Sequence, residues 1–288
     1  MKLLDKPETN LVPDWTFAVI GHPRSDYEED ANPLFRRALN VCNSNNVDIL
    51  FLGGDNILGY NTSLRRYKRD IDKLAEIIDS VSFPVFVAPG NHDYVTREQK
   101  EYFESILNKT YMRITRDTIN FLLLDTVEGN LDVFDGRQFQ IRYTDDCIRK
   151  YYLDTIPRNS GRPIPFSENQ FTLFKKTLLG GGTNPLEDDY FELPHFYGII
   201  MCHPVWRVTD HDWNRRFHKH LIGNNAFVFC GDHQTTNPEY VNIDNVHYIN
   251  TAISANVPSF VIGRFYKRKG LYLSEAALDG NTRLISFK

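Results

Sequence analysis

The sequence predicts an α/β fold in which two β-sheets pack face to face and helices cover their outer surfaces, an α/β/β/α sandwich. Apolar strand-like runs alternate with amphipathic segments in the first half of the chain, whereas strand-like runs dominate the second half. Short polar motifs follow several of the apolar runs, which is where α/β folds place their functional side chains. The chain has 288 residues, 41% of them hydrophobic, so it can bury a large core. We therefore expect a single domain over residues 1–288, with its core at about 14–288.

The first half is predicted to consist of strands joined by helices. Large apolar residues alternate with Thr16 and Ala18 over residues 15–21, which is typical of a strand. Further periodic runs predict helices at 34–41, 64–78 and 97–107, and strands at 48–52, 84–88 and 119–124. Because strand and helix alternate, the strands should run parallel and be joined by right-handed crossovers.

The middle of the chain breaks this pattern. Residues 126–165 show no clean period, are rich in Asp, Arg, Tyr and Pro, and are too many for a simple loop. We expect them to form an insertion over the face that carries the polar motifs. The sequence from Ser167 to Gln170 has the pattern of a capping box, so a helix should begin there and continue through 171–179.

The second half is richer in strands than in helices. Short apolar runs predict strands at 197–201, 227–229, 246–249, 260–262, 271–273 and 284–287. Strands of this kind fit a second sheet that packs on the first.

Charge and composition exclude several classes of function. The formal net charge is −4 and the pI about 6.1, so no bulk attraction to nucleic acid or to an anionic membrane surface is implied. No apolar window is long enough for a membrane helix, and the N-terminus lacks the apolar stretch of a secretory signal. The cysteines lie far apart without a C-x-x-C pair, which favours reduced core thiols. We expect a cytoplasmic protein with neither nucleic acid nor membrane as a partner.

Five polar motifs supply the candidate functional residues. They are Gly21-His22-Pro23-Arg24, Gly53-Gly54-Asp55-Asn56, Gly90-Asn91-His92-Asp93, Cys202-His203-Pro204-Val205-Trp206 and Cys230-Gly231-Asp232-His233-Gln234. Each offers carboxylate, amide or imidazole groups at the predicted end of a strand. Oxygen and nitrogen donors delivered by several strand ends suit divalent metal ions.

Taken in order, these motifs resemble those of the calcineurin-like metallophosphoesterases, over residues 15–255. Within that superfamily the sequence is most similar to the purple acid phosphatases of the small tartrate-resistant type. The most specific matches are Gly90-Asn91-His92-Asp93 and His203-Pro204-Val205-Trp206. The resemblance implies a site for two metal ions that hydrolyses phosphate esters, with the ions generating a hydroxide and neutralising the phosphoryl oxygens.

The resemblance implies a nearly complete ligand set for the second metal. Asp55 matches the bridging carboxylate, Asn91 the asparagine of the G-N-H motif, and His203 the lone histidine that follows a strand. Asp232 stands where the family has histidine, and a carboxylate still ligates divalent ions. His233 would compete with Asp232 if the motif were shifted by one residue. We expect one divalent ion here, Mn²⁺, Zn²⁺ or Mg²⁺.

The first metal site of the family is degenerate in this chain. Its aspartate is replaced by His22, and Arg24, Leu58 and Gln234 stand at other ligand positions. Leu58 cannot ligate a metal, and the Arg24 guanidinium does not lose its proton to become a ligand. Because Leu58 replaces tyrosine, an iron–tyrosinate site is not expected. His22 stays a candidate ligand, and one ion is expected in preference to two.

The remaining roles come from the same resemblance. His92 matches the histidine that contacts substrate or protonates the leaving oxygen, with Asp93 as the residue that orients it. This chain has His22 where the family has aspartate, and Asp232 where the family has histidine. The two differences would together keep one imidazole and one carboxylate near the bridging position. Arg24 is then a candidate fixed cation that replaces part of the charge of the first metal.

Two functions follow from these residues. The chain is expected to hydrolyse a phosphorylated small molecule or another phosphate mono- or diester at an atypical one-metal site. The alternative is an inactive pseudophosphatase that serves as a binding or scaffolding module, because loss of up to three ligands of one metal is typical of such proteins. A nuclease is disfavoured by the acidic balance and by the absence of an aromatic and basic groove pattern.

Overall fold

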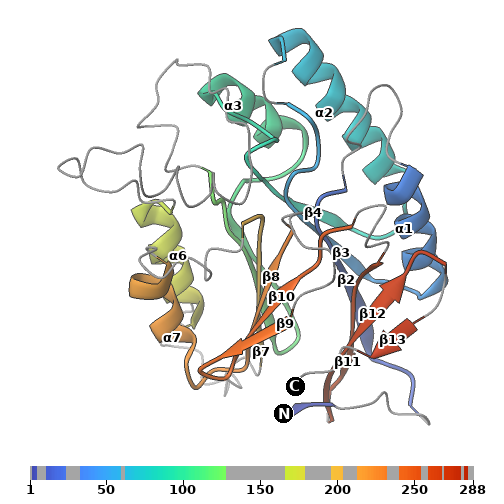
Figure 1. Ribbon diagram of the computed structural model, residues 1–288, viewed down its shortest axis with the longest axis vertical. Coiled ribbons are helices and arrows are strands. Elements are labelled where there is room, and N and C mark those ends of the chain that lie inside the picture. Colours follow the sequence, from blue (N-terminus) through green and yellow to red (C-terminus); the bar gives the residue numbers. More distant parts are fainter. Residues whose placement is uncertain are drawn as a thin grey trace, which may run out of the picture.

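The computed structural model confirms the predicted four-layer architecture. It describes residues 2–4, 11–23, 33–59, 62–127, 166–178, 196–203, 213–231, 240–253, 259–267, 269–279 and 282–284. Two β-sheets lie back to back, and helices cover the outer surface of each (Figure 1). This is the α/β/β/α arrangement that the order of strands and helices predicts. Of the predicted insertion at 126–165, only residues 126 and 127 lie within the described part of the chain.

The first sheet contains the strands that precede three of the motifs. Its order is β1 (Lys2–Leu3), β12 (Gly270–Ala277), β11 (Ser259–Tyr266), β2 (Trp15–Ile20), β3 (Ile49–Gly53) and β4 (Val85–Ala88), with β13 (Thr282–Leu284) paired to β12. Strands β2, β3 and β4 run parallel, as predicted, and β11 is antiparallel to both β2 and β12. The motifs that follow β2, β3 and β4 therefore lie at one end of the sheet.

The second sheet carries the other two motifs. Its order is β5 (Met112–Arg116), β6 (Ile119–Leu123), β7 (Phe196–Met201), β8 (Ala226–Cys230), β10 (Val246–Asn250) and β9 (Tyr240–Ile243). Strands β6, β7, β8 and β10 run parallel, whereas the edge strands β5 and β9 are antiparallel to their neighbours. The sequence does not predict either edge strand, because each is only partly buried and lacks a continuous apolar run.

Helices cover both sheets. Those at 33–44, 64–79, 97–106 and 168–178 lie near predicted positions, whereas the helical segment at 213–221 is not predicted from the sequence. The helices are α1 (Pro33–Ser44), α2 (Leu64–Asp79) and α3 (Arg97–Ile106) on the first sheet, and α6 (Glu168–Leu178), a π-helical segment (Trp213–His218) and α7 (Lys219–Leu221) on the second. Polar caps fix two of the starts: the Ser63 hydroxyl accepts a hydrogen bond from Arg66 N before α2, and a capping box at Thr96 begins α3. Among the described helices, none is long and apolar enough to cross a membrane.

Aromatic and aliphatic side chains fill the space between the two sheets. Phe17 of β2 and Phe51 of β3 meet Phe121 of β6, with ring centroids 5.0 and 4.4 Å from that of Phe121. Every residue of β2 and of β3 is buried, because one face of the sheet packs on the other sheet and the opposite face packs on the helices. This two-sided burial explains why these strands read as continuous apolar runs.

Glycines allow the two sheets to touch at the end that carries the motifs. A Cβ atom on Gly21, after β2, would lie 2.1 Å from the Cα of Gly231, after β8. A Cβ on Gly231 would in turn lie 2.2 Å from the carbonyl oxygen of Gly53. The N–H of Gly21 also donates a hydrogen bond to Thr251 O of the second sheet at 2.9 Å. The two backbones therefore meet where no side chain fits.

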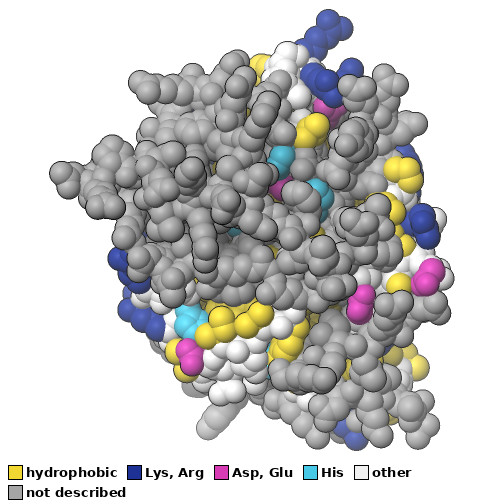
Figure 2. Space-filling view, viewed as in Figure 1, with side chains coloured by type: hydrophobic (Ala, Val, Ile, Leu, Met, Phe, Trp, Pro, Cys, Tyr) yellow, Lys and Arg dark blue, Asp and Glu magenta, His cyan; other side chains and the backbone are white. Residues whose placement is uncertain are grey.

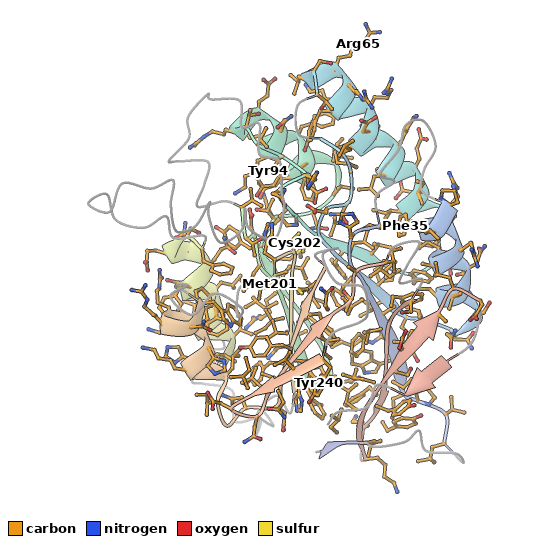
Figure 3. All side chains as sticks on the ribbon, in the orientation of Figure 1. Phe35, Arg65, Tyr94, Met201, Cys202 and Tyr240 are labelled. Atoms are coloured by element: carbon orange, nitrogen blue, oxygen red, sulfur yellow. The ribbon has the colours of Figure 1, made fainter. Side chains whose placement is uncertain are left out.

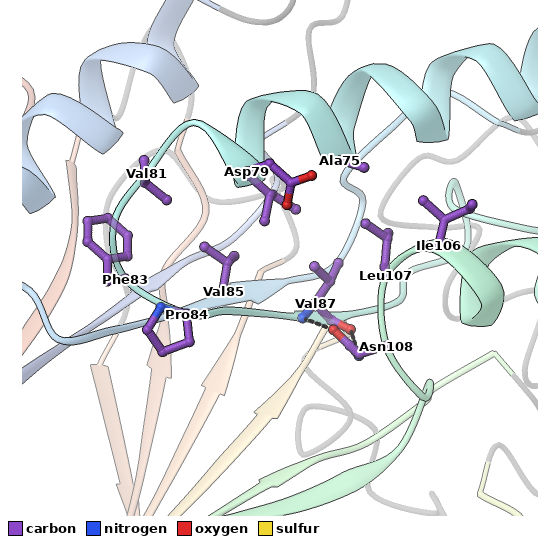
Figure 4. A pocket seen from close by; sticks show the side chains of 11 residues that line it. Ala75, Asp79, Val81, Phe83, Pro84, Val85, Val87, Ile106, Leu107 and Asn108 are labelled. Atoms are coloured by element: carbon purple, nitrogen blue, oxygen red, sulfur yellow. Dashed lines mark hydrogen bonds between the residues drawn. The ribbon is translucent and has the colours of Figure 1, made fainter.

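One edge of the first sheet is covered by a side chain. The Asn108 amide pairs with β4 as a neighbouring strand would: Val87 N donates to its Oδ1 at 2.8 Å, and its Nδ2 donates to Val87 O at 3.0 Å (Figure 4). Such cover guards a sheet edge against pairing with another chain. A pocket of about 330 Å³ lies beside it, lined mostly by residues with apolar side chains, and the described residues that line it include none of the predicted site residues.

Replacing Gly21 by alanine should destabilise the protein strongly. The added methyl group would overlap the Gly231 backbone, and overpacking of a core costs about 1–3 kcal/mol or more. The measurement is the free energy of unfolding in urea. Gly223→Ala is the matched control: its φ is 82° and no atom lies within 4 Å of the added Cβ, so only backbone strain of about 1–2 kcal/mol is expected. A loss no larger for Gly21→Ala than for the control would contradict the close contact.

Candidate functional site

The structure brings the described motif residues to one end of the two sheets. His22, Asp55 and residues 91–93 follow β2, β3 and β4 of the first sheet. His203 follows β7 of the second sheet. Figure 2 shows histidine and acidic side chains together at the surface in the upper middle of the view, near the ends of β3 and β4 in Figure 1.

The carboxylate of Asp55 lies between two imidazole rings. Its Oδ2 is 3.5 Å from Nδ1 of His22 and 3.9 Å from Nε2 of His92. Its Oδ1 accepts a hydrogen bond from the backbone N–H of His92 at 3.1 Å. Asp55 is 3% exposed, and a Cβ on Gly90 would lie 2.3 Å from its Oδ1, so the glycine of the third motif makes room for the carboxylate. The structure thus places three of the predicted site residues next to one another.

The turns after β2 and β3 have unusual backbone geometry. His22 and Asp55 have φ angles of 51° and 54°, in the left-handed region that residues other than glycine rarely adopt. The N–H of His22 donates a hydrogen bond to the carbonyl of Gly54 at 3.1 Å, which ties the two turns together. Residues held in such conformations cluster at functional sites, where the surrounding structure fixes them.

Asn91 and His203, two predicted ligands from different sheets, are in direct contact. Oδ1 of Asn91 is 2.7 Å from Nε2 of His203. Cys202, at the end of β7, packs closely against Gly54 of the first sheet, since a Cβ on Gly54 would lie 2.4 Å from the Cβ of Cys202. Figure 3 shows Cys202 in the middle of the molecule, with Tyr94 above it in the view. Strand β7 therefore delivers His203 to the loops that follow β3 and β4.

The other ring nitrogen of His203 contacts a residue that the motifs do not identify. Nδ1 of His203 is 2.6 Å from the hydroxyl oxygen of Thr126, which is fully buried. Thr126 comes just after β6, at the same end of the second sheet as the other site residues. The sequence does contain a signal for it, since the polar pair Asp125-Thr126 directly follows the apolar run 119–124. Thr126 therefore belongs to the buried site, although it opens the segment predicted as an insertion.

The described contacts of Asp93 differ from the predicted ones. Its carboxylate accepts four hydrogen bonds of 2.7–3.0 Å, donated by the backbone of Gly90, Asn56 and Ile57 and by the Asn56 side chain. None of these bonds involves the His92 ring, which Asp93 is predicted to orient. Burial and the nearby Asp55 charge raise the pKa of Asp93 to about 7, although the backbone donors act in the opposite direction. Asp93 thus fixes the loops after β3 and β4 relative to one another.

The donor groups at this end fit a divalent ion. Asp55 offers carboxylate oxygens, Asn91 an amide oxygen and His203 an imidazole nitrogen, the kinds of atom that Mn²⁺, Zn²⁺ and Mg²⁺ take. The contact between Asn91 and His203 shows that donors from two sheets reach one point. The described residues hold no group of three His, Cys, Asp or Glu placed to bind an ion. Asp232, the fourth predicted ligand, and Arg24 lie outside the described residues.

Comparisons with known proteins identify the family and the fold. The family model described as calcineurin-like phosphoesterase matches residues 22–197, which is more than half of the chain. A dimetal phosphatase from Danio rerio has a similar structure, with a TM-score of 0.60 and 15% identity over 92% of this chain and 96% of its own. No curated protein sequence matches the chain significantly.

Two further solved structures share the fold. GAP50 of Plasmodium, described as the anchor in the inner membrane complex, has a TM-score of 0.54 and 11% identity over 94% of this chain and 88% of its own. The purple acid phosphatase PPD1 of yellow lupin (Lupinus luteus) has a TM-score of 0.53 and 11% identity over 96% of this chain, which spans 53% of the lupin chain. Identities this low show the fold alone. Purple acid phosphatase is thus one distant structural neighbour among several, and is not set apart as the motifs predict.

Asp93→Asn should destabilise the protein by about 1–3 kcal/mol, because the new amide group would face backbone N–H donors and leave buried groups without acceptors. The measurement is the free energy of unfolding in urea near pH 7. Asp79→Asn at the exposed end of α2 is the matched control and should change stability by less than about 0.5 kcal/mol. Equal stability of both variants would show that the buried carboxylate does not hold the two loops.

Proposed function

The chain belongs to the calcineurin-like phosphoesterase family, and from this premise we propose that it is a metal-dependent hydrolase of phosphate mono- or diesters with a one-ion site. The observation that carries the proposal is the 2.7 Å contact between Asn91 and His203, beside the loop of Asp55. It joins donors from both sheets at the strand ends where α/β folds bind their ligands.

Four residues are proposed to hold the ion, namely Asp55, Asn91, His203 and Asp232. Mn²⁺, Zn²⁺ and Mg²⁺ all suit this mixed set of oxygen and nitrogen donors. When bound, such an ion supplies a Lewis acid that neutralises charge on the phosphoryl oxygens. On the first-metal side, Nδ1 of His22 lies 3.5 Å from Oδ2 of Asp55.

His92 is proposed to donate a proton to the leaving oxygen of the ester. Its backbone N–H is anchored on Asp55 Oδ1, and its ring Nε2 lies 3.9 Å from Asp55 Oδ2, so the imidazole faces the proposed ion site. Asp93 acts on it through the backbone, since its hydrogen bonds fix the loop that carries both Asn91 and His92. Arg24 is proposed to bind phosphoryl oxygens as a fixed cation.

The proposed substrate class is a phosphorylated small molecule or another phosphoester. The likeness to purple acid phosphatases supports the proposed reaction class, but an iron–tyrosinate form of the site is not expected, because Leu58 stands at the tyrosine position of the motif. Neither nucleic acid nor a membrane is proposed as a partner, in keeping with the net charge of −4.

The second candidate is a pseudophosphatase that binds a partner without hydrolysis. The observation that favours it is the composition of the first-metal side, where Leu58 replaces a ligand and the described residues contain no three-residue cluster of His, Cys, Asp or Glu. A structure of the same fold, Plasmodium GAP50, is described as an anchor, so the fold can serve such a role.

Metal stoichiometry separates the two candidates. Elemental analysis of the purified protein, after incubation with Mn²⁺ or Zn²⁺, should give one equivalent of metal, and Asn91→Ala should lose it because the amide ligand is gone. Two equivalents would show that His22 and its neighbours rebuild the first site. No bound metal in excess Mn²⁺ and Zn²⁺ would overturn the hydrolase and leave the binding module.

His92→Asn should slow the hydrolysis of esters with poor leaving groups by about 10²–10⁴-fold, the usual contribution of general acid catalysis. Esters with an acidic leaving group, such as p-nitrophenyl phosphate, need little proton donation, so their hydrolysis should change much less. The measurement is kcat/KM over a series of aryl and alkyl phosphates. His220→Asn on α7 is the control and should leave every rate unchanged. A uniform loss across the series would contradict proton donation by His92.

A further inference from the structure

We propose that Thr126 is a positioning residue for His203, and that its hydroxyl partners the imidazole in both the metal-free and the metal-bound tautomer. The metal-free half of this inference stands on the described contacts alone. The metal-bound half rests on the proposed function, because it requires His203 to be a ligand.

The contacts of His203 indicate which ring nitrogen carries the proton when the imidazole is neutral. Nε2 is 2.7 Å from the amide oxygen of Asn91, and Nδ1 is 2.6 Å from the hydroxyl of Thr126. An amide oxygen can only accept a hydrogen bond, so Nε2 must carry the proton and donate it. In a neutral ring Nδ1 is then an acceptor, and the Thr126 hydroxyl donates to it. Both side chains are buried, at 6% exposure for His203 and 0% for Thr126, which restricts competition from water.

Metal binding requires the opposite tautomer. A ligating Nε2 presents its lone pair to the ion, so the ring proton must sit on Nδ1. One proton leaves Nε2 and one is taken up at Nδ1, and the imidazole stays neutral. A carbonyl or carboxylate beside Nδ1 could only accept, and would therefore favour the metal-bound tautomer alone. The hydroxyl of Thr126 both donates and accepts, so it satisfies Nδ1 in either state after a rotation about its C–O bond.

A buried network holds Thr126 in place from both sides. The preceding residue, Asp125, pairs its backbone with the Gln170 side chain: Asp125 N donates to Oε1 at 2.8 Å, and Nε2 donates to Asp125 O at 3.0 Å. The Asp125 carboxylate accepts a hydrogen bond from Val127 N at 2.8 Å and another from the Tyr94 hydroxyl. These bonds fix the backbone on each side of Thr126, so its hydroxyl is presented to His203 by a rigid turn.

The Gln170 contacts show why the sequence pattern there is misleading. The pattern from Ser167 to Gln170 predicts a capping box, and the Ser167 hydroxyl does accept a hydrogen bond from Gln170 N at 3.3 Å. The Gln170 side chain, however, turns to Asp125 instead of closing the box. Helix α6 therefore contributes one of its first side chains to the support of the site.

The first test is the tautomer of His203 in the metal-free, full-length protein. Long-range ¹H–¹⁵N correlation spectra of the imidazoles should show His203 as the Nε2–H form, with His203→Gln used to assign the signal. The Nδ1–H form in the metal-free protein would overturn the inference, because Asn91 would then present its amide nitrogen and Thr126 would only accept. This test needs neither metal nor activity, so it stands even if the proposed function fails.

The second test is the affinity for Zn²⁺, measured by calorimetry. Thr126→Val removes the hydroxyl at nearly constant volume, and loss of such a partner should weaken binding by about 10–100-fold. Thr126→Ser keeps the hydroxyl and should bind within about threefold of the wild type. In the wild type, Zn²⁺ should also move the His203 signal to the Nδ1–H form.

The outcomes separate the two proposals. A wild type that binds no Zn²⁺ but shows the Nε2–H form contradicts the proposed function and leaves the metal-free role of Thr126 in place. Zn²⁺ affinity and tautomer equal to the wild type in Thr126→Val overturn the role of Thr126 while the proposed function stands. If Thr126→Val does not fold, Gln170→Met is the alternative variant, because it removes the hydrogen bonds to the Asp125 backbone and keeps the Thr126 hydroxyl. An affinity for Zn²⁺ equal to that of the wild type in Gln170→Met overturns the inference that this turn positions Thr126.

Discussion

Where β2 and β8 end, the backbones of Gly21 and Gly231 approach so closely that one added methyl group would overlap the facing chain. Sheets that pack through side chains lie about 10 Å apart, which is too far for short side chains at their ends to meet. At Gly21, Gly53 and Gly231, where the functional loops emerge, the two backbones are in contact. As a result, His203 from the second sheet reaches Asn91 from the first. The site exists because the two sheets converge at this end, and the aromatic core behind it keeps the convergence local.

Buried carboxylates then hold the loops that the glycines bring together. The Asp93 carboxylate accepts hydrogen bonds from backbone N–H groups of the loops after β3 and β4. The Asp125 carboxylate accepts one from Val127 N in the turn after β6. Because an unpaired buried donor is costly, each of these carboxylates specifies one loop conformation. The two networks place Asn91 and Thr126 on opposite sides of the His203 ring. Much of the acidic character of this end is thus structural, even where the sequence pattern indicates chemistry.

The sequence predicts the architecture well because two-sided burial leaves continuous apolar runs, and because polar motifs mark the ends of parallel strands. It misses β5 and β9, whose half-buried faces carry no such run. For the site, the motifs identify residues that lie in contact in the structure, Asn91 with His203 and Asp55 with His22. They do not predict that Asp93 bonds to the backbone of Asn56, or that the Gln170 side chain bonds to Asp125 instead of closing the capping box, since these partners lie 37 and 45 residues away in the sequence.

The environment of Asp55 explains how one scaffold can suit both candidate functions. A carboxylate that is 3% exposed is costly unless positive charge or hydrogen-bond donors compensate it. In the proposed hydrolase the ion supplies that charge. The backbone N–H of His92 donates a hydrogen bond to this carboxylate, and the rings of His22 and His92 lie within 4 Å of it. Histidine in place of aspartate at position 22 therefore removes a negative charge from the first-metal side, so that this side needs less metal charge to remain stable. In the proposed one-ion site, histidine at position 22 would therefore leave less negative charge for a second ion to balance.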